Sequence, residues 1–324
     1  MKKNFFIGAV FMVLAAAAFA QTEADFDVTL TDDGTGVVIK NFTGKAPKIG
    51  AAWQVTIPAT IQGMPVKEIA ENAFSRSTYS ERGLNNQGSW VQTTQGMTSV
   101  IIPEGLIKIG YSAFGLPQSI NGSPTLTSIT IPASVTEIGV VAFQGSLITS
   151  ITLPAGLTKL GAGAFQNCTT LKNITIPEGI TEIPEGMLEG CKAITSITLS
   201  DNIRSIGSGA FSGTSIVSFT WPGSVPVENI FRDGLLETIV FAEGVTEIEY
   251  SAFKNYNKLT SVTFPSTIKE IKSSAFYGCS SLTTVTIPDS VETIEFEWDA
   301  FSGCSKLTLA TQAALKRRGY KGHF

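Results

Sequence analysis

The stretch Leu126–Gly145, LTSITIPASVTEIGVVAFQG, decides the fold of this chain, because near copies of it recur. The copies are LKNITIPEGITEIPEGMLEG at Leu171–Gly190, LTSVTFPSTIKEIKSSAFYG at Leu259–Gly278 and LTTVTIPDSVETIEFEWDAFSG at Leu282–Gly303. Self-similarity at a period of roughly 20–50 residues indicates stacked structural units rather than separate domains. We therefore interpret the 324 residues as one long solenoid.

Each repeat is expected to form one coil that begins with a short strand. Alternation places Ile129 and Ile131 on the inner face, and Ser128 and Thr130 on the outer face. Proline then ends the strand, because it has no backbone N–H to donate. Ten coils are predicted from the residues that close these strands, which are Pro58, Pro103, Pro132, Pro154, Pro177, Ser200, Pro222, Ala242, Pro265 and Pro288.

A phenylalanine closes most coils against the next strand. We expect these side chains to stack as a buried spine on the side away from the strands. The spine residues are Phe114, Phe143, Phe165, Phe211, Phe253, Phe276 and Phe301. One coil is shortened, and Phe219, Trp221, Phe241 and Phe264 replace aliphatic residues around it. Because these aromatics face inward by the alternation, they are interpreted as core rather than as a ligand site.

The pattern L-x-x-I-T-I-P, followed by V-T-x-I-G-x-x-A-F-x-x-C, resembles the BspA-type leucine-rich repeats of bacterial surface antigens. Thr60–Phe74, TIQGMPVKEIAENAF, resembles the first coil of that family. The resemblance extends from about Ala51 to the C-terminus. It implies a leucine-rich-repeat solenoid of the α/β horseshoe class, right-handed, with a parallel sheet on the concave face and a mostly irregular or short-helical convex side. It also implies a surface-exposed or secreted protein with a role in adhesion, and it identifies no ligand.

The two ends of the chain differ from the repeats. Residues 1–20 carry two lysines, an apolar run and Ala18-Phe19-Ala20, which predicts a secretory signal peptide cleaved after Ala20. A membrane anchor is the rival interpretation, although the run is short. Residues 21–50 are predicted to form an N-terminal β-hairpin cap, residues 51–307 about ten repeats of roughly 23 residues, and residues 308–324 a C-terminal helical cap.

Two insertions interrupt the period, at residues 75–97 and 115–124. The first is polar and glycine-rich, and it contains Tyr79 and Trp90. Insertions in repeat proteins form loops that often bind partners, so these two aromatic residues are candidate binding residues. A tolerated surface loop is the alternative.

The outward face of the strands carries a column of threonines. The candidate binding residues in it are Thr130, Thr152, Thr175, Thr198, Thr220, Thr263 and Thr286. Threonine also favours strands simply because it is β-branched, so the column has a purely structural alternative. An ice-binding face is a further alternative, but a curved sheet matches the flat surface of an ice crystal poorly.

The four cysteines are compatible with two different states. Cys168, Cys191, Cys279 and Cys304 each lie three residues after the Phe or Leu that closes a coil. Export favours two disulfides, Cys168–Cys191 and Cys279–Cys304. The preferred interpretation is a set of small buried thiols, because other coils place non-thiol residues at this position.

Sequence motifs for catalysis are missing. The one histidine is His323, and no phosphate-binding loop, dinucleotide fingerprint or zinc-protease motif occurs. A net charge of −4 gives no reason to expect nucleic acid. Glu137, Glu182, Glu247 and Glu270 occupy one column, which is interpreted as a solvated face.

The sequence therefore predicts an exported, non-catalytic binding module without metal or cofactor. It would bind an extracellular protein or glycan through the concave sheet and the loop at 75–97. A structural, self-assembling envelope protein is the first alternative, and a glycan-acting enzyme is the second. No later segment has the roughly 20 apolar residues that a membrane span requires.

Overall fold

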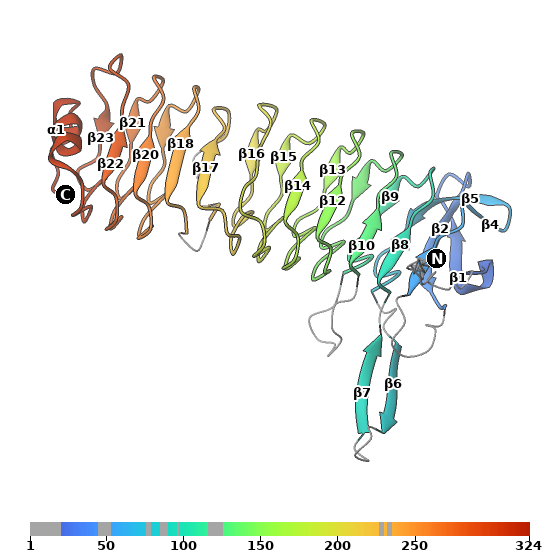
Figure 1. Cartoon of the computed structure of the whole chain (residues 1–324). Coiled ribbons are helices and arrows are strands. Elements are labelled where there is room, and N and C mark those ends of the chain that lie inside the picture. The colour runs from blue at the N-terminus through green and yellow to red at the C-terminus, as the bar shows by residue number, and fades with distance from the viewer. Residues whose placement is uncertain are drawn as a thin grey trace, which may run out of the picture.

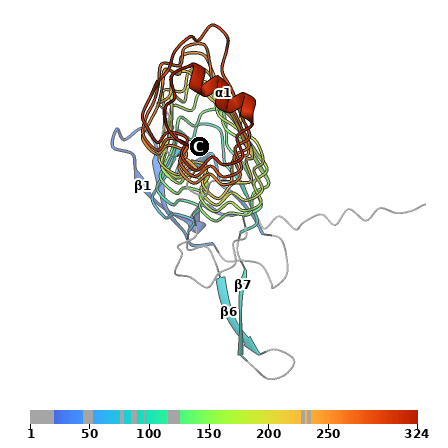
Figure 2. The ribbon, with the colours of Figure 1, turned by 90° about the vertical axis from the view of Figure 1, so that its left-hand side faces the viewer.

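The computed structural model of the chain describes residues 21–44, 53–75, 79–84, 90–95, 97–115, 126–226, 230–231 and 235–324. They form an elongated array of stacked coils, with a hairpin at the N-terminal end and a helix at the C-terminal end (Figure 1). Viewed along the array, the coils surround a common interior (Figure 2), which is filled by buried aliphatic and aromatic side chains. The predicted solenoid is confirmed.

The first strand of most coils belongs to a parallel ladder, which we call the SIT ladder after its Ser-Ile-Thr strands. In β10 and β12 the central isoleucine is buried and its two neighbours are exposed, so the predicted alternation is confirmed. Neighbouring strands are in register, and Ile129 lies beside Val100. The strands are β3 (Gln54–Thr56), β8 (Ser99–Ile101), β10 (Ser128–Thr130), β12 (Ser150–Thr152), β14 (Asn173–Thr175), β17 (Ser218–Trp221), β18 (Thr238–Phe241), β20 (Ser261–Thr263) and β22 (Thr284–Thr286).

A second parallel ladder follows each turn, and the sequence analysis did not foresee it. We call it the EI ladder after its recurring Glu-Ile pairs. Its strands are β5 (Met64–Ile69), β9 (Lys108–Ile109), β11 (Glu137–Ile138), β13 (Lys159–Leu160), β15 (Glu182–Ile183), β16 (Ser205–Ile206), β19 (Glu247–Ile248), β21 (Glu270–Ile271) and β23 (Glu295–Phe296). Because successive coils have similar shapes, their backbones also lie within hydrogen-bonding distance along this ladder. Gly139 N, for example, donates to Ile109 O in the preceding coil at 2.8 Å.

A third line of contacts joins the turns that carry the phenylalanines. The N–H groups of Phe114 and Phe143 donate to the carbonyls of Ala142 and Ala164 in the following coil, both at 2.9 Å. Val141, within one of these turns, has φ +47°. The coils of Phe114 and Phe143 are thus tied together at three places around their circumference, while the strand pairing of each ladder is interrupted elsewhere in the array.

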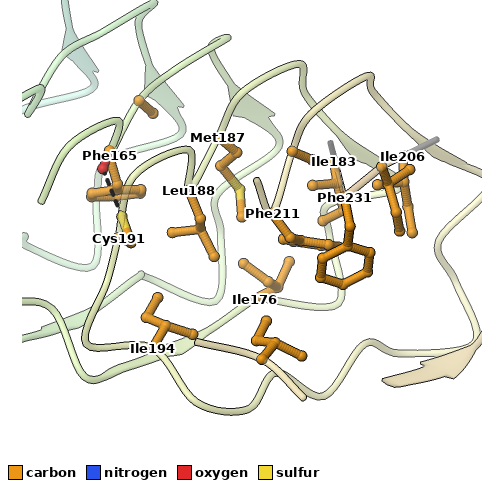
Figure 3. Close-up of a cluster of buried hydrophobic side chains, with 14 of the residues drawn as sticks. Phe165, Ile176, Ile183, Met187, Leu188, Cys191, Ile194, Ile206, Phe211 and Phe231 are labelled. Carbon is orange, nitrogen blue, oxygen red and sulfur yellow. Dashed lines mark hydrogen bonds between the residues drawn. The ribbon is translucent and has the colours of Figure 1, made fainter. Parts of the chain in front are cut away.

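The predicted phenylalanine spine is confirmed, and all seven residues are buried. Phe143 stacks on Phe114 and Phe165, with ring centroids 5.6 and 5.5 Å apart, and Phe276 stacks on Phe301 at 5.1 Å. Leu188 interrupts the stack in the middle of the array, where Figure 3 shows it between the coils of Phe165 and Phe211.

The aromatic residues of the shortened coil are also core. Phe219, Trp221, Phe241 and Phe264 are all buried, and Trp221 packs edge-on against Phe219 and Phe253. Its indole N–H donates to the carbonyl of Val225 at 3.1 Å. The large rings fill the interior where the backbone of the coil is shorter. The prediction that these aromatic residues belong to the core is confirmed.

The N-terminal cap is an antiparallel hairpin of β1 (Phe26–Leu30) and β2 (Val37–Phe42), preceded by a 3-10 turn at Glu23–Asp25. Strand β2 pairs with β5, while the short β4 (Thr60–Ile61) pairs with the other end of β5. The hairpin therefore occupies the position of a preceding coil and continues the EI ladder.

The C-terminal cap is helix α1 (Leu309–Arg317), whose N-cap Thr308 accepts from the N–H of Thr311. The C-cap residue Arg318 is buried, and its guanidinium donates to the carbonyls of Val291 at 3.0 Å and Pro288 at 3.1 Å. Arg318 thereby satisfies acceptors at the end of the array.

The insertion at 75–97 contains an antiparallel hairpin, β6 (Tyr79–Leu84) paired with β7 (Trp90–Gln95). It projects sideways from the N-terminal third of the array (Figure 1). The predicted signal peptide at 1–20 and most of the second insertion at 115–124 lie outside the described residues.

The spine predicts a specific cost of truncation. Phe143→Ala should lower the free energy of unfolding by about 3–5 kcal/mol, because it leaves a cavity between two stacked rings. Denaturant unfolding followed by circular dichroism measures this loss. Val140→Ala, which shortens an exposed side chain three residues away, is the matched control and should change stability little. Equal effects of the two substitutions would contradict the assignment.

Candidate binding surfaces

The structure places six of the seven predicted threonines on the outer face of the SIT ladder, whereas Thr198 lies in a segment that forms no strand. Thr263 is half-buried and the other six members are exposed. Register aligns Thr152 with Thr175, and Thr263 with Thr286. Ile101 and Val240 occupy the same column, with 45% and 36% of their surface exposed. The face is therefore hydroxyl-rich with aliphatic interruptions, a detail that the sequence analysis missed.

Hydroxyl groups elsewhere on the strands are already engaged. Thr127 and Thr283, which precede β10 and β22, donate to the carbonyls of Thr98 and Thr260 in the preceding coil, each at 3.0 Å. In the described part of the chain, the hydroxyls of the threonine column make no hydrogen bond of this kind. They remain available to a ligand as both donors and acceptors.

Tyr79 and Trp90 are not brought together. In the hairpin register Tyr79 faces Gln95, and Trp90 faces Leu84. The two residues therefore lie at opposite ends of the hairpin, Tyr79 near the array and Trp90 near the tip. Six-residue strands rise about 3.4 Å per residue, so a contact that used both residues would have to extend along the hairpin.

The EI ladder carries ionic interactions that the sequence analysis treated only as a solvated column. Glu137 pairs with Lys108 at 3.1 Å and with Lys159 at 3.7 Å. Toward the C-terminus, Lys272 pairs with Glu247 and with Glu249, and these hydrogen bonds raise the pKa of Lys272. A groove lies beside Glu137 on this face, and alternation within two-residue strands is too short a signal to predict it.

Several carboxyl groups act as anchors between coils or within turns. Burial would raise the pKa of Asp299, but hydrogen bonds from Ser274 and Ser273 lower it overall. The Ser266 N–H and hydroxyl likewise lower the pKa of Glu243, and the Thr31 and Thr35 hydroxyls lower that of Asp33. All three are held as anions, which suits structural acceptors and is the opposite of what a general acid needs.

The cysteines are free and buried, as the preferred interpretation predicted. Each thiol also does something the sequence did not indicate, since it donates to the carbonyl of a phenylalanine in the preceding coil (Figure 3 shows one pair). The bonds are Cys168 to Phe143 at 3.2 Å, Cys191 to Phe165 at 3.0 Å, Cys279 to Phe253 at 3.1 Å and Cys304 to Phe276 at 3.2 Å. The neighbouring Cys168 and Cys304 thiols, together with burial, raise the pKa of Cys191 and Cys279.

Two searches of the described residues found nothing. No group of three or more histidine, cysteine, aspartate or glutamate side chains there could hold a metal ion. Within the same residues, no helix is long and apolar enough to cross a membrane.

Parallel ladders, an asparagine- or cysteine-containing turn and a continuous apolar core define this fold as a leucine-rich-repeat solenoid. A family model described as "BspA type Leucine rich repeat region (6 copies)" matches residues 117–228 and 227–314. The chain belongs to this BspA-type leucine-rich repeat family, which confirms the resemblance found in the sequence.

Several solved structures are similar to this chain. A leucine-rich repeat protein from Bacteroides ovatus ATCC 8483 is 18% identical over 88% of this chain and 92% of its own, with a TM-score of 0.42. The pneumococcal vaccine antigen PcpA is 19% identical over 87% and 78%, with a TM-score of 0.46. A leucine-rich cell surface protein from Faecalibacterium prausnitzii A2-165 is 20% identical over 87% and 97%, with a TM-score of 0.37. No curated protein matches. The family match alone establishes the class.

Thiol labelling tests the cysteine ladder. The folded protein should react with no equivalent of a thiol reagent, because the four groups are buried and out of reach of the reagent. In guanidinium without reductant, four equivalents should react. A value below four that reductant restores would mean that disulfides replace the thiol–carbonyl bonds.

The anchoring role of Asp299 predicts a pH dependence. Asp299→Asn removes acceptors for Ser273 and Ser274, at 2.7–2.8 Å, and should lower the free energy of unfolding by about 1–3 kcal/mol at pH 7. Because the folded-state pKa is depressed, this stability is present above about pH 4 and is lost as the pH falls through the folded pKa. Urea unfolding from pH 7 to 2.5 should show the two proteins converging at low pH. The exposed Asp201→Asn is the control; parallel curves for Asp299→Asn would contradict the role.

Proposed function

We propose that the protein is an exported, non-catalytic binding module that attaches to an extracellular protein or glycan. The contact surfaces are the threonine column of the SIT ladder, predicted to be concave, and the β6–β7 hairpin. The observation that carries the proposal is the column of exposed hydroxyls without internal partners, presented at strand spacing along a rigid array. Such a face makes many equivalent polar contacts with an extended partner.

The hairpin supports the same function in a different way. It stands away from the array near β8 (Figure 1), so it can reach a partner that also covers the nearby SIT strands. Tyr79 and Trp90 are the aromatic residues within it, and aromatic side chains with a polar edge are frequent anchors in interfaces. Their separation along the hairpin favours two contact points over one pocket.

Export belongs to the proposal as well. Residues 1–20 have the composition of a cleaved signal peptide, and the proposed mature protein then consists of a cap at 21–50, the repeats at 51–307 and a helical cap at 308–324. Membership of a family of bacterial surface proteins supports a location on the cell surface or outside the cell.

A binding role is favoured over a glycan-cleaving one by the state of the carboxyl groups. Among the described residues, the three carboxyls with a clearly displaced pKa are all lowered, whereas a glycosidase requires one carboxyl group with a raised pKa to protonate the leaving group. We therefore propose that carboxylates here position backbone and side chains.

Self-assembly is the second candidate function, and one observation favours it. In the described residues β6 and β7 pair only with each other, so both outer edges of the hairpin offer free N–H and C=O groups to another strand. Sedimentation velocity across a hundredfold concentration range separates the two functions: a monomer throughout supports the binding module, and a growing species that deletion of the hairpin abolishes supports assembly.

Binding to panels of extracellular matrix proteins and glycans tests the proposal. The mature form should bind at least one member. Thr152→Lys together with Thr175→Lys should weaken that binding about tenfold or more, because two buried interface charges would be unpaired. Deletion of residues 77–96 should weaken it as well.

The matched control is Ser205→Lys, an exposed substitution on the EI ladder, which should leave the affinity unchanged. If both surface variants bind as well as the parent protein, the proposed contact surfaces are wrong. If the mature form binds no panel member, the binding function itself is wrong.

A further inference from the structure

We infer that the groove on the EI ladder is a binding site for a neutral oligosaccharide. This site lies on strands other than those of the proposed threonine face. The inference rests on the proposed function in one respect, namely that the protein holds its ligand without cleaving it. The shape of the groove, its balanced charge and one exposed aromatic ring support it.

The groove has the dimensions of a small-ligand site. It encloses about 560 Å³ beside β9, β11, β13 and β15, within the range of roughly 300–1,000 Å³ typical of ligand sites. Four adjacent strands about 4.8 Å apart give it an elongated form along the array. An elongated groove across several repeats suits a short linear chain better than a compact metabolite.

Backbone forms part of the lining of the groove. Gly139 and Gly161 line it. A Cβ added to Gly139 would lie 2.6 Å from the carbonyl carbon of Gly110, and one added to Gly161 would collide with the backbone of Gly139 and Val140. Side chains at these two positions are therefore incompatible with the stacking of the coils, so glycine is required at this part of the groove.

The charges that line the groove balance one another. Glu137 Oε1 lies 3.1 Å from Lys108 Nζ, and Glu137 Oε2 lies 3.7 Å from Lys159 Nζ. Glu182, which is exposed, lines the other side. Two lysines and two glutamates sum to zero, so the groove offers no net attraction to an anion or a cation. It does offer ammonium donors and carboxylate acceptors held in place by mutual pairing, which is what a hydroxyl-rich neutral ligand needs.

Tyr111 supplies the remaining element of the site. It lines the groove with 49% of its surface exposed, although a tyrosine of its size gains by burial. The corresponding positions in the next two coils are Val140 and Ala162, so no other aromatic ring adjoins the groove in this column. The C–H face of a sugar ring packs on such an aromatic face while its hydroxyls reach the charged side chains.

Other ligand classes fit less well. A phosphorylated or sulfated ligand would need an excess of positive charge, and the groove has none. An apolar peptide segment would need a lining free of charge, whereas two lysines and two glutamates line this groove beside Val140 and Leu160. A neutral polyhydroxylated chain is the class that uses all three features.

Isothermal titration of the mature protein with neutral malto-, cello-, xylo- and chito-oligosaccharides tests the inference, with sulfated and sialylated oligosaccharides in parallel. One neutral series should bind, and Tyr111→Ala should weaken that binding about tenfold or more. Glu137→Gln, which releases both lysines, should weaken it too and serves as the second variant if Tyr111→Ala is unstable. The matched control is Tyr250→Ala, at the same coil position but outside the groove and 65% exposed.

The outcomes separate this inference from the proposed function. Neutral binding that Tyr111→Ala or Glu137→Gln weakens and Tyr250→Ala does not supports the groove. No neutral binding at 10 mM sugar, binding of charged oligosaccharides only, or equal loss with Tyr250→Ala overturns it. A protein that binds a matrix component through the threonine face but no neutral oligosaccharide would overturn the groove and leave the proposed function standing. Shortening of the bound sugar, followed by mass spectrometry, would overturn the non-catalytic premise.

Discussion

Backbone hydrogen bonds between successive coils are the interaction on which the rest of the structure depends. They run along paired strands of the SIT ladder, along paired strands of the EI ladder and through the phenylalanine turns, so neighbouring coils are held together on up to three sides. This spacing forces equivalent side chains into columns. Inward columns become a stacked core of aliphatic and aromatic groups, while glycine is required where two backbones approach most closely, as at Gly139 and Gly161. Within the repeats, only the outward columns remain free to vary.

The sequence predicted most of what this repetition dictates. A strand such as Ser128–Thr130 has a clear alternation, and the phenylalanine position recurs often enough to reveal the spine. The EI ladder was not predicted because most of its strands are only two residues long, which is too short to show an alternating pattern of apolar and polar residues. The thiol–carbonyl bonds were missed because they connect residues 25–28 apart across neighbouring coils, a relation that only the stacking defines. The contacts of Arg318 were not predicted for the same reason, since the carbonyls of Val291 and Pro288 that accept from it belong to the last coil and not to its own helix. The separation of Tyr79 from Trp90 depends on a hairpin register that glycine-rich sequence does not specify.

The EI ladder shows how one backbone supports different surfaces. In its N-terminal half Lys108, Glu137 and Lys159 alternate in charge, and register places each beside its opposite. In its C-terminal half Glu247, Glu270 and Glu295 stand in direct register, which is unfavourable for like charges. Lys272, the residue that directly follows β21, pairs with Glu247 and Glu249 and offsets part of the repulsion between the glutamates. These glutamates and lysines lie at the surface and not in the core, so the difference between the two halves is a difference in outward side chains on the same backbone ladder.

This division between a fixed core and variable columns bears on how such a protein gains affinity. Each coil adds one outward position per column at a constant interval, and a rigid array loses little conformational entropy on binding. Individually weak contacts from hydroxyls therefore accumulate along an extended partner, whereas a compact ligand could meet only two or three of them. A compact or short ligand instead requires a place where neighbouring columns differ in height. The groove beside Tyr111 is such a place, because Gly139 and Gly161 carry no side chain there while lysine, glutamate and tyrosine also line it. Under the two proposals, long partners are matched to the regular face and short ones to the irregular face of the same array.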